Sequence, residues 1–92
     1  MCGFSVAISM NSRKHIPFSN LKKMNEMIPH RGPDKESYFK NTNFFKDNKI
    51  KFSMGFRRLK IIDLSSRANQ PFFFLNRYVI VFNGEIYNYL EI

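Results

Sequence analysis

MCGFSVAISM, residues 1–10, carries the only cysteine of the chain at position 2, directly before an apolar segment. The short apolar run from Gly3 to Met10 predicts a buried β-strand that begins at the N-terminus. Loss of Met1 would make Cys2 the amino-terminal residue. A cysteine used for packing or for binding a metal has no reason to occupy that position, so this stretch bears on chemistry as well as on fold.

Size and composition limit the classes of protein that the chain can represent. Its 92 residues leave room for one small domain, and 43% hydrophobic residues with 11 phenylalanines indicate a folding sequence. Lysine and arginine number 15 against 7 acidic residues, which gives a net charge of +8. The basic residues are scattered along the chain, so the charge does not favour a nucleic-acid partner.

Targeting and metal-binding signals are missing from the sequence. One cysteine excludes an internal disulfide and a multi-cysteine zinc site, and we expect no metal site. No run approaches the ~18 apolar residues of a membrane span, and the N-terminus lacks a signal peptide. We therefore expect a cytoplasmic protein without a membrane partner.

The apolar pattern and the turn residues predict the remaining elements. Ser19 is expected to cap a helix that runs to about Ile28, with Leu21, Met24 and Ile28 on its buried face. The expected elements after this helix are a hairpin in residues 36–50 around Lys46, Asp47 and Asn48, one or two strands in 51–64, a loop in 65–71, a hairpin in 72–82 turning near Asn76 and Arg77, and the start of a helix in 83–92. Together they predict an α+β fold with mostly antiparallel strands and one or two helices.

Cys2 is a candidate nucleophile because both groups that the reaction needs would belong to one residue. The α-amine of a mature N-terminal cysteine has a reference pKa of about 7.7–8.0, so it can accept a proton near neutral pH. It can then activate the thiol without a separate histidine. The alternative is an ordinary small residue at a fraying chain end.

The stretch FNGEIYN, residues 82–88, has two interpretations. An Asn-Gly pair after an apolar run is usually a hairpin turn. Alternatively, the Asn83 side-chain amide and the Gly84 N–H form paired donors for a tetrahedral oxyanion. Glu85 could bind a substrate ammonium group, or serve as an acid in the first turn of a helix.

The stretch RRLKIID, residues 57–63, offers a carboxylate ligand. Adjacent arginines on a strand point to opposite faces, so only one of Arg57 and Arg58 can reach a given pocket. A guanidinium group binds a carboxylate through two parallel hydrogen bonds. The alternative is a solvent-facing arginine on an edge strand. HRGPD, residues 30–34, indicates only the end of a helix.

The order of five motifs is more specific than any one of them. MCGF, HRGPD, RRLKIID, NQP and NGEIYN together resemble the glutaminase domain of glutamine-dependent asparagine synthetases. The resemblance covers the whole chain and implies a partial N-terminal-nucleophile hydrolase fold, an αββα sandwich. It also implies that residues 1–92 are the N-terminal portion of a glutamine amidotransferase domain, with the rest of that domain and a synthetase domain missing.

The same resemblance assigns roles to individual residues. Cys2 corresponds to the nucleophile, Asn83 and Gly84 to the oxyanion hole, and Arg58 to the ligand of the glutamine carboxylate. The implied glutamine-binding set is Arg58, Leu59, Lys60, Ile61, Ile62, Asn83, Gly84 and Glu85, in which the backbone of 59–62 is a strand lining the pocket and Glu85 binds the α-ammonium. Residues 30–34 and 69–71 would hold the walls of the site. Phe56 departs from the family, since many relatives have histidine there.

The implied activity is the hydrolysis of glutamine to glutamate and ammonia, for ATP-dependent amidation of aspartate to asparagine. No cofactor is expected in this chain, and Mg-ATP is expected in the missing synthetase domain. The implied partners are glutamine, that domain and, in the full-length protein, a second copy of the chain. The fragment alone is expected to be inactive.

Three alternatives remain open at this stage. The first is a sibling amidotransferase with another carboxylate acceptor, for example in surface-sugar biosynthesis. The second is a catalytically silent fragment, and the third is a basic binding module. Glucosamine-phosphate synthases and phosphoribosyl amidotransferases also begin with cysteine, but their sequences differ around RRLKIID and NGEIYN.

Overall fold

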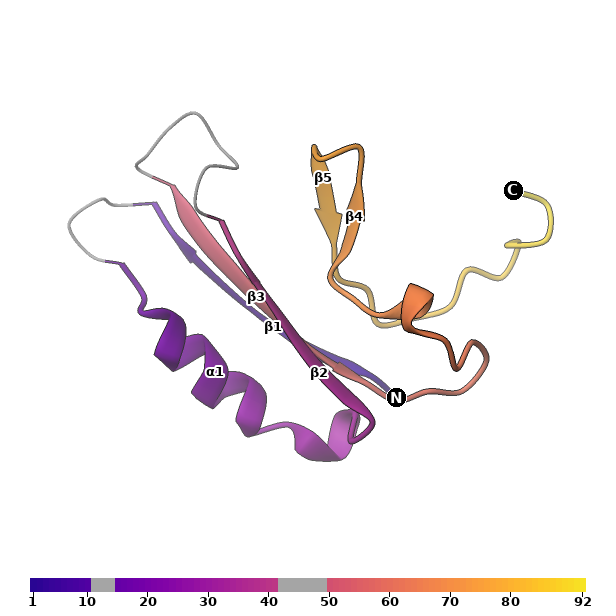
Figure 1. Cartoon of the computed structure of the whole chain (residues 1–92), viewed down its shortest axis with the longest axis horizontal. Helices are drawn as coiled ribbons and strands as arrows, with labels where there is room; N and C mark the ends of the chain where they lie inside the picture. The colour runs from indigo at the N-terminus through magenta and orange to yellow at the C-terminus, as the bar shows by residue number, and fades with distance from the viewer. Residues whose placement is uncertain (11–14, 42–49) are drawn as a thin grey trace.

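The computed structural model describes residues 1–10, 15–41 and 50–92, and its layers are shown in Figure 1. The elements in chain order are β1 (Gly3–Ser9), α1 (Phe18–Glu26), a 3-10 turn (Pro29–Arg31), β2 (Lys35–Lys40), β3 (Lys51–Arg58), a second 3-10 turn (Ser66–Ala68), β4 (Phe72–Phe74) and β5 (Tyr78–Ile80). Every strand pair is antiparallel. The predicted α+β class with mostly antiparallel strands is therefore confirmed.

Strand β3 is the centre of the larger sheet, whose strand order is β1-β3-β2. Gly3 of β1 lies opposite Arg57, and Lys35 of β2 lies opposite Arg58. The C-terminal end of β3 is thereby held between the start of β1 and the start of β2. This register brings the N-terminus of the chain beside the RRLKIID segment.

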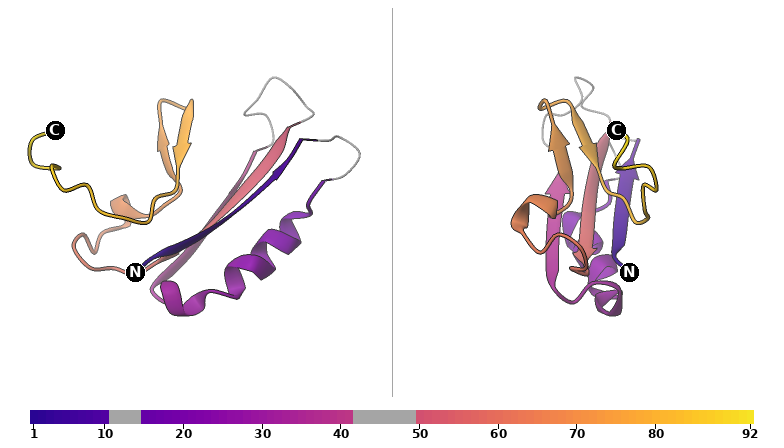
Figure 2. Two further views of the ribbon diagram at one scale, coloured as in Figure 1. Left: turned by 180° about the vertical axis from the view of Figure 1, so that it is seen from behind. Right: turned by 90° about the vertical axis from the view of Figure 1, so that its right-hand side faces the viewer.

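Helix α1 covers one face of this sheet, as the two views of Figure 2 show. Small residues on the covered face allow the close approach: a Cβ added to Gly55 would lie 3.0 Å from the side-chain Cγ of Asn25. Leu21 and Asn25, one helical turn apart, are fully buried against the sheet. Packing of this face holds a nine-residue helix that is too short to be stable alone.

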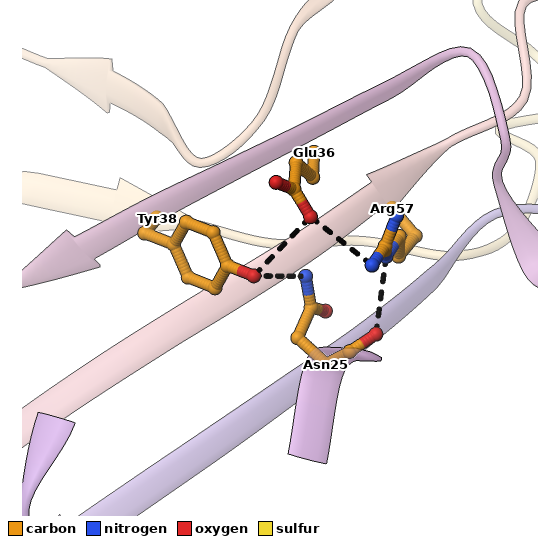
Figure 3. A network of polar contacts seen from close by, with 4 residues as sticks. All are labelled: Asn25, Glu36, Tyr38 and Arg57. Atoms are coloured by element: carbon orange, nitrogen blue, oxygen red, sulfur yellow. Dashed lines mark hydrogen bonds and ion pairs between the residues drawn. The ribbon is translucent and has the colours of Figure 1, made fainter. Parts of the chain in front are cut away.

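A network of polar contacts fastens α1 to β2 and β3 (Figure 3). Arg57 forms an ion pair with Glu36 at 3.0 Å, and its Nε–H donates to the main-chain oxygen of Asn25 at 3.0 Å. The Asn25 amide donates to the Tyr38 hydroxyl at 3.2 Å, and that hydroxyl donates to Glu36 at 3.4 Å. A guanidinium group at the C-terminal end of a helix also interacts favourably with the helix dipole.

The β4–β5 hairpin lies on the face of the large sheet opposite α1 (Figures 1 and 2). The rings of Phe39 and Phe73 meet edge to face with centroids 5.0 Å apart, and the Ser37 hydroxyl donates to the main-chain oxygen of Gln70. The layers are therefore helix, three-stranded sheet and two-stranded sheet. This order is consistent with a partial N-terminal-nucleophile hydrolase fold.

The hairpin predicted in residues 72–82 is present as an antiparallel strand pair. Strands β4 and β5 turn at Leu75 and Asn76, which both have positive φ, one residue earlier than expected. Positive φ at both central residues matches the twist of a two-residue hairpin. The hairpin predicted in residues 36–50 needs a correction: β2 pairs with β3, which was expected as a separate strand beyond residue 50. The expected turn at residues 46–48 lies outside the described residues.

The predicted first helix needs two corrections. Pro17, and not Ser19, is its N-cap, and no side chain caps it. The buried face is formed by Leu21 and Asn25, whereas Met24 is 45% exposed. The spacing of apolar residues does not predict this face, because Asn25 is polar and is buried through its hydrogen bond to Tyr38 and its contact with Gly55.

Two further elements differ from the sequence-based expectation. Residues 59–62 were expected to continue a strand, but β3 ends at Arg58, and the Lys60 N–H bonds to the Asp34 carboxylate and to no neighbouring strand. Residues 83–92 were expected to start a helix, but they contain only turns. Most of these residues are exposed, so no packing stabilises a short helix there. Within the described ranges, none of the helices is long and apolar enough to span a bilayer.

Gly32 provides a test of how HRGPD supports β3. A Cβ added at this position would lie 2.5 Å from both the main-chain oxygen of Arg57 and the main-chain nitrogen of Arg58. We predict that Gly32→Ala lowers the free energy of unfolding by about 1–3 kcal/mol, because neither backbone atom can move away freely. Thermal denaturation followed by circular dichroism measures the change.

The matched control for this substitution is Gly84→Ala, for which the three atoms nearest to the added methyl group all belong to the ring of Phe82. A ring can rotate away, so the control is expected to melt within about 2 °C of the wild type, which is well under 1 kcal/mol for a domain of this size. Equal melting temperatures for wild type and Gly32→Ala would contradict the close approach of HRGPD to β3.

Candidate active site

The register between β1 and β3 places Cys2 beside Leu59. The Leu59 N–H donates to the Cys2 Sγ at 3.3 Å, and the thiol is directed toward the Leu59 carbonyl oxygen at 3.6 Å. Cys2 is a free cysteine and is partly buried. The thiol is therefore held at the end of β3, next to the residue that follows Arg58.

Arg58 is buried on the opposite face of β3 from Arg57. Its side chain is only 5% exposed, and its Nη1 donates to the Ser65 main-chain oxygen at 2.6 Å and to Asn69 Oδ1 at 2.7 Å. Its Nη2 donates to the main-chain oxygen of Asp63. The expectation that the two adjacent arginines reach different faces is confirmed, since Arg57 belongs to the network beneath α1.

The charge of Arg58 has no direct anionic partner in the part of the chain that the structure describes. All three of its acceptors are uncharged oxygens. Burying a charge without a counterion costs several kcal/mol, and a bound anion removes much of that cost. The arrangement is therefore suited to binding a carboxylate.

Asp63 shapes the loop that surrounds Arg58. Its carboxylate accepts the Ser65 N–H at 2.8 Å, a local turn that orients the Ser65 carbonyl toward the guanidinium. Hydrogen bonds from the Ser65 side chain and backbone lower the pKa of Asp63 from its usual 3.8, and the charges of Arg67 and Arg58 add smaller effects. The carboxylate thus bonds to its own loop, and only its backbone carbonyl meets Arg58.

HRGPD braces the end of β3 from the other side. The Asp34 N–H donates to the Arg58 carbonyl oxygen at 3.1 Å, and the Asp34 carboxylate accepts the Lys60 N–H at 2.8 Å. Gly32 packs directly on the β3 backbone. This segment contacts the backbone on both sides of Leu59, in line with the wall-forming role that the sequence suggested for it.

NQP holds the start of the second predicted site segment. The Gln70 amide donates to the Phe82 carbonyl oxygen at 3.1 Å, and its Oε1 accepts the Phe82 N–H at 2.5 Å. Pro71 is buried and follows a cis peptide bond. A cavity of about 700 Å³ opens between this loop and the hairpin, but neither Cys2 nor Arg58 lines it.

Among the described residues, no hydrogen bond joins Asn83, Gly84 or Glu85 to Cys2. In Figures 1 and 2 the chain after β5 first comes down toward the N-terminus and then leads away to the C-terminus. Gly84 lacks positive φ and no strand follows it, so the Asn-Gly pair is not a hairpin turn. The oxyanion-hole and ammonium-binding roles of these residues remain predictions.

The remaining predicted glutamine ligands, residues 59–62, differ in how exposed they are. Leu59 contacts the thiol, while Lys60, Ile61 and Ile62 are exposed. Sequence reasoning missed the contributions of Asp63 and Ser65, although an aspartate two residues before a serine is a common signal for a local turn. No three histidine, cysteine or acidic side chains gather into a possible metal site within residues 1–10, 15–41 and 50–92.

Comparison with known proteins assigns the chain to a family. The chain matches the glutamine amidotransferase domain model over residues 1–92 and belongs to that family. It is 48% identical to asparagine synthetase (glutamine-hydrolysing) 1 of Bacillus subtilis, over 78% of this chain and 10% of that protein. It is 36% identical to putative asparagine synthetase (glutamine-hydrolysing) 2 of Methanocaldococcus jannaschii, over the whole chain and 20% of that protein.

A relative with a different name is also similar over nearly the whole chain. Amidase chry2 of Gibberella zeae is 35% identical over 97% of this chain and 14% of its own length. The chain therefore spans one fifth or less of the length of each relative named here. No solved structure gives a significant match.

The pKa of Asp63 gives a test of the loop around Arg58. Hydrogen bonds to the charged carboxylate lower its pKa in the folded state, so we predict that it titrates below 3.8. The resulting stabilisation is present above 3.8 and is lost as the pH falls through the lower, folded-state pKa. Carboxyl-carbon NMR of the labelled protein measures the titration.

Ser65→Ala is the matched control, because it removes the hydroxyl group and keeps the backbone N–H. The Asp63 pKa is expected to rise partway toward 3.8 in this variant. A wild-type Asp63 that titrates at or above 3.8 would contradict the loop geometry.

Proposed function

We propose that this chain carries the glutaminase half-reaction of an asparagine synthetase, in which Cys2 hydrolyses glutamine to glutamate and ammonia. The observation that supports this most is the pairing of two groups at one end of β3. A thiol rests on the Leu59 backbone, and the preceding residue is a buried arginine with no anionic partner among the described residues. The family match and the names of the relatives agree with this chemistry.

In the proposed reaction Arg58 binds the α-carboxylate of glutamine and the side-chain amide reaches Cys2. Once Met1 is removed, the α-amine of Cys2 takes the thiol proton and the sulfur attacks the amide carbon. The tetrahedral intermediate collapses when the same proton is given to the leaving nitrogen, which departs as ammonia. Water then hydrolyses the γ-glutamyl thioester to glutamate and regenerates the thiol.

Three further residues take supporting roles in this proposal. Asn83 and Gly84 stabilise the oxyanion with their N–H groups, and Glu85 binds the substrate α-ammonium. Each donor of this kind is typically worth about 2.7–4 kcal/mol in the transition state. These roles require the segment after β5 to lie beside Cys2, and two hydrogen bonds with Gln70 hold Phe82 at the start of that segment.

The fate of the ammonia belongs to the same proposal. We assign residues 1–92 to the N-terminal portion of a glutamine amidotransferase domain in a longer cytoplasmic enzyme. A synthetase domain would bind Mg-ATP and aspartate and would receive the ammonia, and two copies of the full-length protein would form a dimer. The names of these relatives, and the small share of their length that this chain matches, support its assignment to a longer asparagine synthetase.

A second candidate is an amidotransferase that transfers ammonia to another acceptor. The similarity to a relative named an amidase, over nearly the whole chain, favours considering it. The site residues of this chain are the same in both cases. Identification of the amidated product by mass spectrometry separates the two: asparagine supports the first candidate, and another amide supports the second.

Replacement of the nucleophile tests the division of labour. We predict that Cys2→Ala in the intact protein reduces glutamine-dependent synthesis on the order of 10³-fold or more, since a nucleophile cannot be replaced by its neighbours. Synthesis from ammonium salts is expected to stay within about twofold of the wild type, because the synthetase reaction does not use Cys2. Product formation measured with each nitrogen source gives both rates, and loss of both activities in a folded variant would overturn the assignment.

A further inference from the structure

We propose that Asn69 positions Arg58 and, as a neutral acceptor, keeps the guanidinium charge available for the substrate carboxylate. This inference rests on the proposed function and extends it from Arg58 to a residue that does not touch the substrate. Sequence analysis placed Asn69 only in a wall-forming motif.

The Nη1 nitrogen of Arg58 donates to two acceptors, the Ser65 carbonyl oxygen at 2.6 Å and Asn69 Oδ1 at 2.7 Å. Two short bonds from one nitrogen fix both the position and the plane of the guanidinium. Asn69 is the only side chain among the three acceptors of Arg58 in the described part of the chain.

The loop leaves some of the Arg58 donors unused. A guanidinium has five N–H groups. Two on Nη1 and one on Nη2 bond to the loop, which leaves the Nε–H and one N–H of Nη2. Two remaining donors match the two oxygens of a carboxylate, so the loop fixes Arg58 without using all of its binding capacity.

The loop around Arg58 also leaves its charge unpaired by a carboxylate. Asp63 is the acid nearest to Arg58 in the loop, but its carboxylate accepts the Ser65 N–H, and its main-chain oxygen is what meets the guanidinium. An aspartate at position 69 would have nearly the same shape as asparagine and would place a full negative charge at an acceptor only 2.7 Å from Nη1. Such an ion pair would compete with the substrate carboxylate for the same cation.

Two substitutions separate this role from a structural one. Asn69→Asp keeps the hydrogen bond and adds an ion pair, so a merely structural role predicts unchanged or higher stability and an unchanged KM. The proposal predicts that KM for glutamine rises about 10- to 100-fold with kcat within about threefold, because the carboxylate of the substrate loses its cation. Asn69→Ala removes the bond without adding charge, and a smaller rise in KM is expected.

Asn20→Asp is the matched control, because it makes the same charge change on the exposed first turn of α1. It is expected to keep the wild-type KM. Glutaminase kinetics on the intact protein give KM and kcat for each variant, and thermal denaturation reports whether Asn69→Asp is folded.

Binding of L-glutamate, followed by calorimetry in a Cys2→Ala background, gives a second readout that does not depend on catalysis. Weaker glutamate binding in Asn69→Asp, with unchanged glutamate binding in Asn20→Asp, supports the positioning role of Asn69 even if Cys2 proves not to be the nucleophile. A wild-type protein that hydrolyses glutamine, together with an unchanged KM in Asn69→Asp, overturns this inference alone. Failure of the Cys2→Ala protein to bind glutamate at all overturns the inference together with the carboxylate-binding role of Arg58.

Discussion

The positions of Arg57, Arg58 and Cys2 depend on one constraint, the position of β3 between β1 and β2. Because β3 is paired on both sides, the alternation of its side chains is fixed, and the last two residues of the strand must point to opposite faces. Arg57 is directed to the helix and binds Glu36 and the end of α1. Arg58 is directed to the other face and is enclosed by the loop that follows. Two identical neighbours thus serve structure and proposed chemistry separately.

The same register also sets the position of the thiol. Antiparallel pairing of Gly3 with Arg57 leaves Cys2 at the point where β3 ends. The Leu59 N–H therefore donates to the Cys2 sulfur and not to a neighbouring strand. The Asp34 segment then holds the chain on either side of Leu59. The first residues of a chain ordinarily fray, and here the sheet restrains the proposed nucleophile.

Much of the fold and of the candidate site could be predicted from the sequence, because these features follow from local rules and from the order of the motifs. Alternation predicted the opposite faces of Arg57 and Arg58, and the apolar run predicted β1. The buried face of α1 could not be predicted, since Asn25 is polar and is buried through tertiary contacts with Tyr38 and Gly55. The end of β3 at Arg58 depends on Cys2 and Asp34, which lie far away in the sequence. The site segment at 83–85 was predicted from its motif alone, and its position relative to Cys2 depends on contacts that no local pattern encodes.

We propose that Cys2, as the free N-terminal residue, is the nucleophile that attacks glutamine. Treatment of the intact protein with the glutamine analogue diazo-oxo-norleucine, followed by intact-mass measurement and peptide mapping, tests it most directly. We predict one covalent adduct per chain, located on Cys2, in protein from which Met1 has been removed. Protein that retains Met1, or an adduct that forms elsewhere or not at all, would contradict it.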